Sequence, residues 1–227
     1  MIFQVAVDGP AGSGKSSVSK LVAQKYGFTY LDTGAMYRAC AYIEKISASS
    51  QTPFLELLKK SDMRFAPSES GQRMFITINN SETEITDIIR TPEITAMVGE
   101  VAAIADVRHL MTTKQKELAN SGKVIMEGRD IGTVVLPNAD VKFFFTASPT
   151  ERAKRRQAEW KAKGMEVPLE QLENDIKVRD EMDSSRSEAP LKKADDAIEL
   201  DTTGLTIDEV ISIMSAEIER KLKKLRF

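Results

Sequence analysis

The segment Gly9-Pro-Ala-Gly-Ser-Gly-Lys15-Ser16 leaves this chain few folds to choose from, because it is a glycine-rich turn between a strand and a helix. It fits the pattern G-x-x-x-x-G-K-[ST] without a mismatch. Glycines allow backbone N–H groups to converge on an anion without side chains in the way. The helix that starts near Lys15 adds the partial positive charge of its N-terminus. The sequence therefore predicts a loop that binds phosphate groups.

Short apolar segments alternate with helical patterns along most of the chain. The predicted strands are residues 3–8, 28–32, 124–127, 141–146 and 197–201. Helices are predicted at residues 33–46, 92–104, 106–120, 149–163, 168–184 and 206–225, and a further one opens at Thr52-Pro53 with proline at its first position. Strands that alternate with helices form βαβ units, so we expect a parallel sheet with helices on both faces.

Residues 63–90 follow a different pattern. Apolar and polar side chains alternate at period two in three short segments, 63–66, 73–78 and 84–88, which are separated by Gly71 and by Asn79-Asn80-Ser81. This pattern predicts a small antiparallel β-insert attached to the main architecture.

Charge and cysteine content exclude several classes of protein. The net charge is −2 and the isoelectric point is about 5.7, so any basic site is local and no nucleic-acid partner is expected. A single cysteine (Cys40) and a single histidine (His109) rule out an internal disulfide and a Cys/His zinc cluster. One cysteine fits a reducing compartment, and no apolar run approaches the roughly 18 residues of a membrane span. We therefore expect a cytoplasmic protein with no membrane partner.

Polar side chains follow the predicted strands where these end. Asp32, Thr33, Tyr37 and Arg38 come directly after the second strand. In open α/β sheets the ligand cleft lies at the carboxyl ends of the strands. These side chains are therefore predicted to face a second ligand beside the phosphate loop.

A second polar group follows the strand at residues 124–127. Glu127 ends that strand, as a carboxylate near Mg²⁺ does in phosphate-loop proteins, and the Ser16 hydroxyl is suited to the same ion. Arg129 and Asp130 offer a fork for phosphate and a hydrogen-bond acceptor side by side. Lys15 supplies a mobile charge for the β- and γ-phosphates of a nucleotide.

Two arginine-rich segments complete the pattern. Glu151-Arg-Ala-Lys-Arg-Arg156 opens one helix and Arg179-Asp-Glu-Met-Asp-Ser-Ser-Arg186 lies on the next. With the phosphate loop, Leu31–Arg38 and Gly128–Thr133, these segments resemble the bacterial-type cytidylate kinases. That family shows G-P-x-G-x-G-K, L-D-[ST]-G-A-x-Y-R, G-R-D-x-G-T, E-R-A-x-R-R and R-D-x-x-D-x-x-R in this order. The resemblance covers essentially the whole chain.

The resemblance implies an α/β fold: a P-loop NTPase core with a five-stranded parallel sheet and helices on both faces, a lobe with the β-insert, and a helical lid. The core would comprise residues 1–32, 106–148 and 195–227, the monophosphate-binding lobe residues 33–105, and the lid residues 149–194. The implied activity is Mg²⁺- and ATP-dependent phosphorylation of CMP and dCMP. We expect a monomer.

The resemblance also implies roles for individual residues. The ATP-binding set is Gly9, Pro10, Ala11, Gly12, Ser13, Gly14, Lys15, Ser16 and Ser17. The CMP-binding set is Asp32, Thr33, Tyr37, Arg38, Arg108, Arg129, Asp130, Arg179, Asp183 and Arg186. The catalytic set is Lys15, Arg129, Arg152, Arg156, Arg179 and Arg186, with Arg155 as a further lid arginine. Magnesium would be held by Ser16 and Glu127.

Recognition of the nucleoside is implied at four of these residues. Asp130 would accept from the N4 amino group, Arg108 would donate to the base, and Asp183 with Arg179 would hold the ribose. Uracil has a carbonyl in place of the amino group, so Asp130 would repel UMP.

Two departures bear on these roles. Gly99 stands where the family commonly has serine, which removes a hydroxyl expected near the base. The selectivity for cytosine could be looser, or a water could substitute for the hydroxyl. Glu127 replaces an aspartate found in many members, and its extra methylene favours reaching the metal through water.

Two alternatives stay open at this point. The chain could be a kinase of the same architecture that acts on another small acceptor, such as UMP. It could also be a nucleotide-binding module without turnover, although its acidic isoelectric point argues against an association with RNA.

Overall fold

In the computed structural model, which describes residues 1–68, 71–162 and 164–225, the loop from Gly9 to Gly14 joins strand β1 (Phe3–Asp8) to helix α1 (Lys15–Tyr26). The predicted strand–loop–helix arrangement is therefore confirmed. The chain forms two compact units. The first consists of Met1–Leu31 and the chain from Ala119 onward, and the second of Asp32–Leu118.

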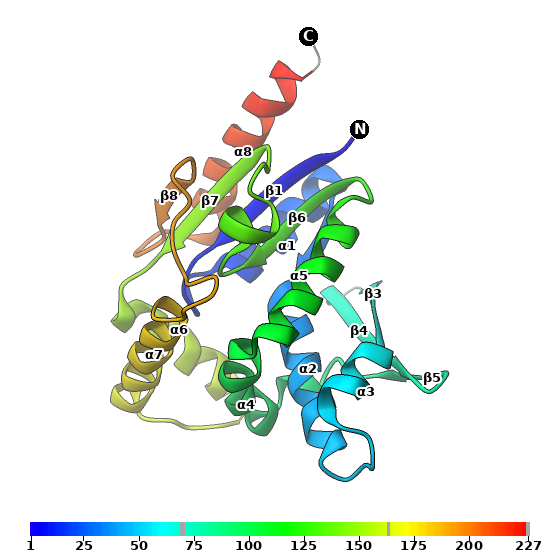
Figure 1. Ribbon diagram of the computed structural model, residues 1–227. Coiled ribbons are helices and arrows are strands. Elements are labelled where there is room, and N and C mark those ends of the chain that lie inside the picture. Colours follow the sequence, from blue (N-terminus) through cyan, green and yellow to red (C-terminus); the bar gives the residue numbers. More distant parts are fainter. Residues whose placement is uncertain (69–70, 163, 226–227) are drawn as a thin grey trace. The chain divides into compact units, whose positions relative to one another are not determined.

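A five-stranded sheet in the order β2-β6-β1-β7-β8 forms the centre of the first unit (Figure 1). The other four strands are β2 (Thr29–Asp32), β6 (Lys123–Gly128), β7 (Val141–Thr146) and β8 (Ile198–Asp201). β1 pairs in parallel with β6 and β7, and β7 pairs in parallel with β8. The parallel α/β architecture predicted from the sequence is thus confirmed, and its strand order places β1 and the loop that follows it at the centre.

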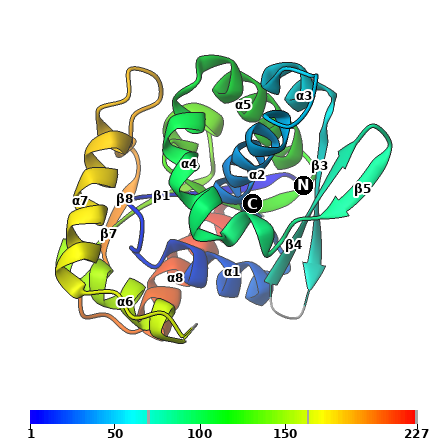
Figure 2. The ribbon, with the colours of Figure 1, turned by 90° about the horizontal axis from the view of Figure 1, so that it is seen from below.

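Apolar side chains on both faces of the strands form the core of the first unit. Val5, Val7, Phe143 and Phe145 are almost completely buried, as expected for parallel strands covered on both sides. Helices α1 and α8 (Ile207–Lys224) pack behind the sheet in Figure 1, and the short π-helical turn η2 (Ile131–Val135) crosses in front of it (Figures 1 and 2). η2 follows β6 directly, so it holds the segment after β6 against β1.

Helices α6 (Pro149–Ala162) and α7 (Leu169–Ser184) form a pair in the same unit. Ala153, Leu172 and Ile176 are buried between them in a small apolar cluster. Ser148 accepts a hydrogen bond from the N–H of Glu151 at 3.2 Å, which caps α6 as its sequence predicts. The predicted end of this helix at Lys163 lies outside the described residues.

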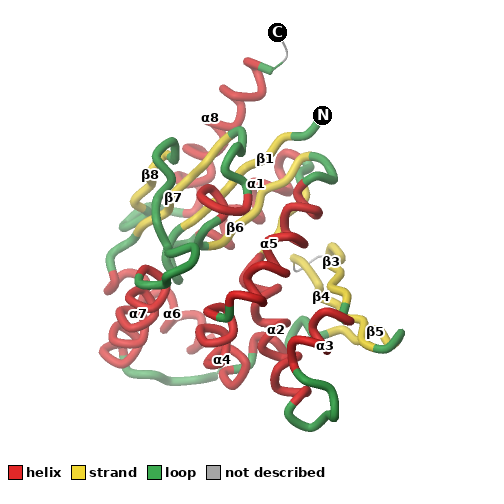
Figure 3. Tube along the Cα trace, in the orientation of Figure 1, coloured by secondary structure: helices red, strands yellow, loops and turns green. Residues whose placement is uncertain are grey.

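The second unit packs helices against a small sheet of its own (Figure 3). Its helices are α2 (Thr33–Ser47), α3 (Phe54–Lys60), η1 (Ile88–Arg90), α4 (Pro92–Ala103) and α5 (Ala105–Ala119), and its strands are β3 (Asp62–Ser68), β4 (Gly71–Ile78) and β5 (Ser81–Glu84). The strands are antiparallel in the order β3-β4-β5. Met36, Ile43, Leu58, Ile76 and Ile94 belong to its buried core.

The antiparallel insert is confirmed, but its third strand differs from the prediction. The strand is Ser81–Glu84, so the expected strand at residues 84–88 is wrong. Asn79 and Asn80 have φ angles of 50° and 64°, which allow a two-residue turn that starts the next strand at once. Ile85 is fully buried in the core of this unit instead of alternating along a strand.

Two further features differ from, or add to, the sequence prediction. Helix α3 begins at Phe54, so Pro53 precedes the first helical residue instead of occupying it. In the described part of the chain, no helix is both long enough and apolar enough to cross a membrane.

Candidate active site

Glycines give the phosphate loop a backbone that other residues could not adopt. Gly9, Gly12 and Gly14 have φ angles of 143°, 77° and 86°. A Cβ on Gly9 would lie 2.1 Å from the carbonyl oxygen of Phe145 at the end of β7. The loop is therefore packed against the sheet so closely that only glycine fits, and Lys15, Ser16 and Ser17 form the first turn of α1 behind it.

The Lys15 side chain lies over its own loop. Its Nζ donates to the carbonyl oxygen of Pro10 at 2.8 Å and to Ser13 Oγ at 3.4 Å. Burial, and then the nearby Arg129, lower the pKa of Lys15 to about 7, although Glu127 and Asp8 act in the opposite direction. A phosphate group in the loop would offer this buried amine the negative charge that it lacks.

Ser16 and Glu127 meet as the sequence predicts for a metal site. Ser16 Oγ donates to Glu127 Oε2 at 2.9 Å, and the hydroxyl of Tyr30 donates to Glu127 Oε1. Glu127 is 3 % exposed, at the end of β6. A hydroxyl and a carboxylate are the oxygen donors that Mg²⁺ prefers, so this pair fits the ion.

Asp183 on α7 gathers two of the predicted arginines. Its Oδ2 accepts from Arg129 Nε at 2.8 Å, and its Oδ1 accepts from Arg186. Burial alone would raise the pKa of Asp183, but Arg129, Arg186 and Arg179 outweigh burial and hold it below its usual value. Because Arg129 and Asp183 also interact with Lys15, these groups lie around the phosphate loop.

Arg152 does not point freely toward a ligand. It is 3 % exposed, and its guanidinium pairs with Asp180 at 3.0 and 2.6 Å. It also donates to the carbonyl oxygens of Ala11 at 3.2 Å and Ala147 at 3.0 Å. In this structure these donors connect α6 to α7 and to the phosphate loop, and the catalytic role of Arg152 stays a prediction.

The two other lid arginines also have protein partners. Arg155 donates to Thr202 Oγ1 at 3.0 Å and to the carbonyl oxygen of Thr202 at 2.7 Å. Thr202 Oγ1 in turn donates to the carbonyl oxygen of Ser13 at 3.0 Å, so α6 is linked to the phosphate loop. Arg156 lies 5.6 Å from the centroid of the Trp160 ring.

The second unit holds its own predicted set at the start of α2. Asp32 caps this helix, since its Oδ1 accepts from the N–H of Ala35 at 2.9 Å, while its Oδ2 accepts from Arg38 Nη2 at 2.9 Å. A Cβ on Gly34 would lie 3.0 Å from Asp32 Oδ1 and 3.3 Å from Arg38 Nη1, so the glycine makes room for this pair. Arg38 Nε is buried without a hydrogen-bond partner in the described residues.

Arg108 and Tyr37 pack together in the same unit. The Arg108 guanidinium lies 5.7 Å from the centroid of the Tyr37 ring, and its Nη1 donates to the carbonyl oxygen of Ala102 at 3.3 Å. Both side chains are less than 10 % exposed. Thr33 is buried at the first position of α2. The sequence-predicted residues of this unit are thus confined to α2, its N-cap and α5.

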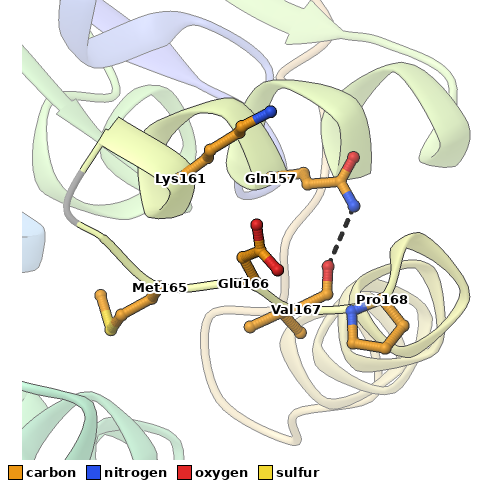
Figure 4. Close-up of a pocket in the computed structure, with 6 residues that line it drawn as sticks. All are labelled: Gln157, Lys161, Met165, Glu166, Val167 and Pro168. Atoms are coloured by element: carbon orange, nitrogen blue, oxygen red, sulfur yellow. Dashed lines mark hydrogen bonds between the residues drawn. The ribbon is translucent and has the colours of Figure 1, made fainter.

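Neither a cluster of metal-binding side chains nor a cavity adds further residues to the predicted site residues described above. The described residues contain no group of three or more His, Cys, Asp or Glu side chains suited to a metal ion. A cavity of about 510 Å³ lies beside the connection between α6 and α7 (Figure 4). It is lined by Gln157, Lys161, Met165, Glu166, Val167 and Pro168, none of which is a predicted site residue.

Comparison with known proteins identifies the family. A sequence model of the family described as cytidylate kinase matches residues 5–220. The chain belongs to the cytidylate kinase family. It is 44 % identical over 222 residues to a cytidylate kinase of Carboxydothermus hydrogenoformans, which covers 96 % of this chain and 98 % of that protein. It is 47 % identical over 225 residues to a cytidylate kinase of Lactobacillus gasseri, which covers 98 % of this chain and 96 % of that protein.

Solved structures show the same fold at low sequence identity. An uncharacterized protein from Eubacterium ventriosum matches with a TM-score of 0.54 and 14 % identity, over 96 % of this chain and 98 % of that one. A gluconokinase from Sinorhizobium meliloti matches with a TM-score of 0.52 and 15 % identity, over 99 % of this chain and 96 % of that one. These likenesses concern the fold of this chain alone.

Sequence reasoning missed three residues that shape the site. Asp8 accepts two backbone hydrogen bonds from the segment after β6, Tyr30 donates to Glu127, and Thr202 links α6 to the phosphate loop. Asp8 and Thr202 stand at or just after the carboxyl ends of β1 and β8. The rule that ligand sites lie at these ends would have selected both.

Proposed function

We propose that this chain transfers the γ-phosphoryl group of ATP, with Mg²⁺, to CMP or dCMP, giving ADP and CDP or dCDP. The observation that carries this proposal is the environment of Lys15, whose buried ammonium group interacts with Glu127, Arg129 and Asp183. A phosphate loop, a metal-binding pair and an arginine cluster are the parts that phosphoryl transfer requires. Membership of the cytidylate kinase family supports the choice of acceptor.

The phosphate loop would hold the donor. Its backbone N–H groups and the N-terminus of α1 would bind the β- and γ-phosphates of ATP, with Lys15 turning from Pro10 toward them. Arg155 lies against this loop, since its Nη1 would be 3.5 Å from a Cβ on Gly14. We propose that Arg155 and Arg156 of α6 act on the donor side, and that Arg152 holds α6 in place.

Ser16 and Glu127 would hold the metal. Ser16 Oγ and Glu127 Oε2 lie 2.9 Å apart, so both oxygens can face one ion. The long Glu127 side chain suits a contact with that ion through water. When bound there, Mg²⁺ would neutralise negative charge on the phosphate groups of ATP.

Arginines would hold the phosphate of the acceptor. Arg38 supports this role, because its buried Nε has no hydrogen-bond partner in the described residues and an anion would supply one. Arg129, Arg179 and Arg186 lie around Asp183 in the first unit and bring positive charge near Lys15. An arginine that contacts the transferring charge contributes about 10³-fold or more to the rate.

Asp130, Arg108 and Asp183 are proposed to recognise the nucleoside. Asp130 is 4 % exposed at the start of η2 and would accept from the cytosine amino group. Arg108, stacked near Tyr37, would donate to the base. Asp32 and Thr33, at the start of α2, would complete the acceptor contacts. Gly99 lies within α4 and offers no hydroxyl there, which would loosen the selectivity for cytosine.

The reaction itself needs positioning more than acid–base chemistry. A phosphate oxygen of CMP attacks the γ-phosphorus, a new O–P bond forms, and the bond to the β,γ-bridging oxygen breaks. The electron pair of that bond leaves with ADP. No proton has to move when the CMP phosphate is already doubly ionised, which it is above its second pKa of about 6. The protein then has to neutralise charge and exclude water.

Initial rates with a panel of acceptors test the proposal. With ATP and Mg²⁺ we expect CMP and dCMP to react faster than UMP or AMP. Lys15→Ala is expected to lower kcat/KM by about 10²- to 10³-fold, because the phosphates lose a buried cation. Lys223→Ala removes an exposed lysine from the last turn of α8 and is the matched control, with an unchanged rate expected.

Two outcomes would contradict the proposal. A rate with UMP above the rate with CMP would favour a kinase of the same architecture with another acceptor. No formation of ADP from ATP, CMP and Mg²⁺ would favour a nucleotide-binding module without turnover.

A further inference from the structure

Tyr30 is a residue of β2 that the proposed mechanism does not use. Its side chain is half-buried and packs against the apolar core of the first unit, which includes Phe28 and Ile125. β2 lies beside β6 in the five-stranded sheet. The Tyr30 hydroxyl donates to Oε1 of Glu127, the buried carboxylate near the end of β6. Tyr30 therefore reaches the proposed metal site from the neighbouring strand.

The two oxygens of the Glu127 carboxylate accept from different hydroxyl groups. Oε1 accepts from Tyr30, and Oε2 accepts from Ser16 Oγ at 2.9 Å. Ser16 lies in the first turn of α1 and is exposed, whereas Tyr30 lies in the sheet and is half-buried. The carboxylate is thus held between one hydroxyl of the phosphate-loop helix and one hydroxyl of β2.

An ion at this site would affect the two hydrogen bonds differently. In the proposed function Ser16 Oγ faces Mg²⁺, so the direction of its hydroxyl would then be set by the ion. The Tyr30 hydroxyl lies on the other oxygen of the carboxylate, so its hydrogen bond does not compete with the ion for Oε2. Tyr30 can therefore hold the Glu127 side chain both before and after an ion binds.

A glutamate needs such a restraint more than a shorter acidic residue does. Its long side chain loses conformational entropy when it is fixed in one orientation. Lys15 is a competing partner, because its buried ammonium group attracts the Glu127 carboxylate. A carboxylate that turned toward Lys15 would leave the ion and would neutralise the charge that Lys15 is proposed to bring to the phosphates. The hydrogen bond from Tyr30 opposes this movement.

Burial makes the hydroxyl of Tyr30 hard to replace. Glu127 is only 3 % exposed, so water has little access to the oxygen that would lose its donor. Hydrogen-bond donors to a metal-binding carboxylate are part of the metal site, and their removal lowers the affinity for the metal by about 10- to 100-fold.

We propose that Tyr30 is a positioning residue for the metal site: by holding Oε1 of Glu127, its hydroxyl keeps Oε2 beside Ser16 and so strengthens the binding of ATP together with Mg²⁺. This inference rests on the proposed function, in which Ser16 and Glu127 hold the ion. Because Tyr30 acts through Glu127, its hydroxyl matters for the nucleotide bound with the metal and not for the nucleotide bound alone.

The test measures nucleotide binding to Tyr30→Phe, which keeps the ring and removes only the hydroxyl. The probe is a non-hydrolysable ATP analogue with nitrogen between the β- and γ-phosphorus atoms. Calorimetric titration gives its Kd with saturating Mg²⁺ and its Kd with EDTA. We expect the Kd with Mg²⁺ to rise about tenfold, the lower end for a donor of this kind, and the Kd with EDTA to stay unchanged.

Two results would overturn the role of Tyr30. One is an unchanged Kd with Mg²⁺. The other is an equal rise of both Kd values, which would show a general disturbance of the phosphate loop. Both values come from the same sample, so a partly unfolded fraction leaves their ratio valid.

Tyr26→Phe is the matched control. Tyr26 is the last residue of α1, packs against the same apolar core, and donates to Glu219 Oε1 of α8 at 2.6 Å. The variant therefore removes a hydrogen bond of the same kind away from the Ser16–Glu127 pair, and we expect both Kd values to stay unchanged. A rise with Mg²⁺ as large as in Tyr30→Phe would overturn the specific role of Tyr30.

A double variant tests whether Tyr30 acts through Glu127. Adding Tyr30→Phe to Glu127→Gln should change the Kd with Mg²⁺ very little beyond Glu127→Gln alone, because the charged group that Tyr30 positions is already lost. A further tenfold rise would show that Tyr30 acts by another route and would overturn the inference.

Failure of this inference can be told from failure of the proposed function. If Glu127→Gln raises the Kd with Mg²⁺ and Tyr30→Phe does not, the role of Tyr30 is overturned while the role of Glu127 stands. If Glu127→Gln leaves that Kd unchanged, the assignment of Glu127 to the metal fails, and this inference fails with it. If the wild type forms no ADP from ATP, CMP and Mg²⁺, the proposed activity fails, and the Kd values still decide whether Tyr30 positions the metal site.

Discussion

Asp183 joins two arginines that come from different parts of the chain, Arg129 after β6 and Arg186 after α7. Its pKa lies below the usual value, because the arginines outweigh the effect of burial. A carboxylate with a lowered pKa in the folded state stabilises the fold at pH values above its unfolded pKa of about 4, and this contribution disappears as the pH falls below that value.

Asp183→Asn tests this contribution. We expect the variant to be less stable than the wild type by about 1–3 kcal/mol at pH 7, because the partly buried Arg129 and Arg186 lose their charged partner. The difference in stability should shrink as the pH falls below about 4, where the Asp183 carboxyl of the unfolded chain takes up a proton while the folded protein still holds it ionised. Urea unfolding of both proteins at pH 7, 4 and 3 measures the difference in their free energy of unfolding. A difference that stays constant over this range would contradict the stabilising role of the Asp183 carboxylate.

Glu127 provides a second residue-scale prediction. Glu127→Gln keeps one acceptor oxygen, which can serve either Ser16 or Tyr30, and removes the negative charge. We expect the Mg²⁺ concentration for half-maximal rate to rise several-fold at fixed ATP, because the ion loses a charged partner. A rate titration with Mg²⁺ measures this, and an unchanged titration would show that Glu127 has no part in binding the ion.

How much of the site could be predicted residue by residue depends on how far apart two interacting residues lie in the sequence. The phosphate loop could be predicted because its pattern is contiguous from Gly9 to Ser16. The hydrogen bonds of Asp8 could not be predicted, because their backbone donors lie 123 and 124 residues away. The ion pair of Arg152 with Asp180 could not be predicted for the same reason, since Asp180 lies 28 residues further along the chain.

At the scale of elements, the end of β8 supports the phosphate loop. Thr202 follows β8, is 2 % exposed, and its hydroxyl accepts from Arg155 of α6 while it donates to the carbonyl oxygen of Ser13. The end of β8, helix α6 and the phosphate loop therefore meet at the Thr202 hydroxyl. Loss of this hydroxyl should disturb the donor side of the site.

Thr202→Val tests this link. We expect KM for ATP to rise about tenfold, the size of one lost buried hydrogen bond, while KM for CMP changes little. Thr202→Ser restores the hydroxyl and should restore KM for ATP. Thr203→Val is the matched control, because Thr203 accepts from the N–H of Ser148 instead of binding the loop. A serine variant as impaired as the valine variant would contradict the role of the hydroxyl.

Element types followed from the sequence more reliably than element ends. The apolar runs of β1, β6 and β7 and the helical stripes around them reflect burial, which local patterns report well. The third strand of the insert was misplaced, because the turn at Asn79-Asn80 is shorter than the pattern indicated. The alternation at residues 84–88 was produced by Ile85, which packs into a core instead of a sheet face.

At the scale of the whole molecule, the parallel sheet could be predicted but its strand order could not. The order β2-β6-β1-β7-β8 depends on pairings between strands more than a hundred residues apart, such as β1 with β6. The two units divide at Leu31 and Leu118, so nearly all of α5 belongs to the second unit, whereas the sequence analysis assigned residues 106–148 to the core. Local patterns do not reveal which core a helix joins.

Transfer of label from ATP to CMP tests the central claim most directly. The protein is incubated with Mg²⁺, CMP and ATP labelled at the γ-phosphate, and the products are separated. The account predicts label in CDP, and about 10²- to 10³-fold less of it with Lys15→Ala. Label that stays in ATP, or that appears only in inorganic phosphate, would contradict the account.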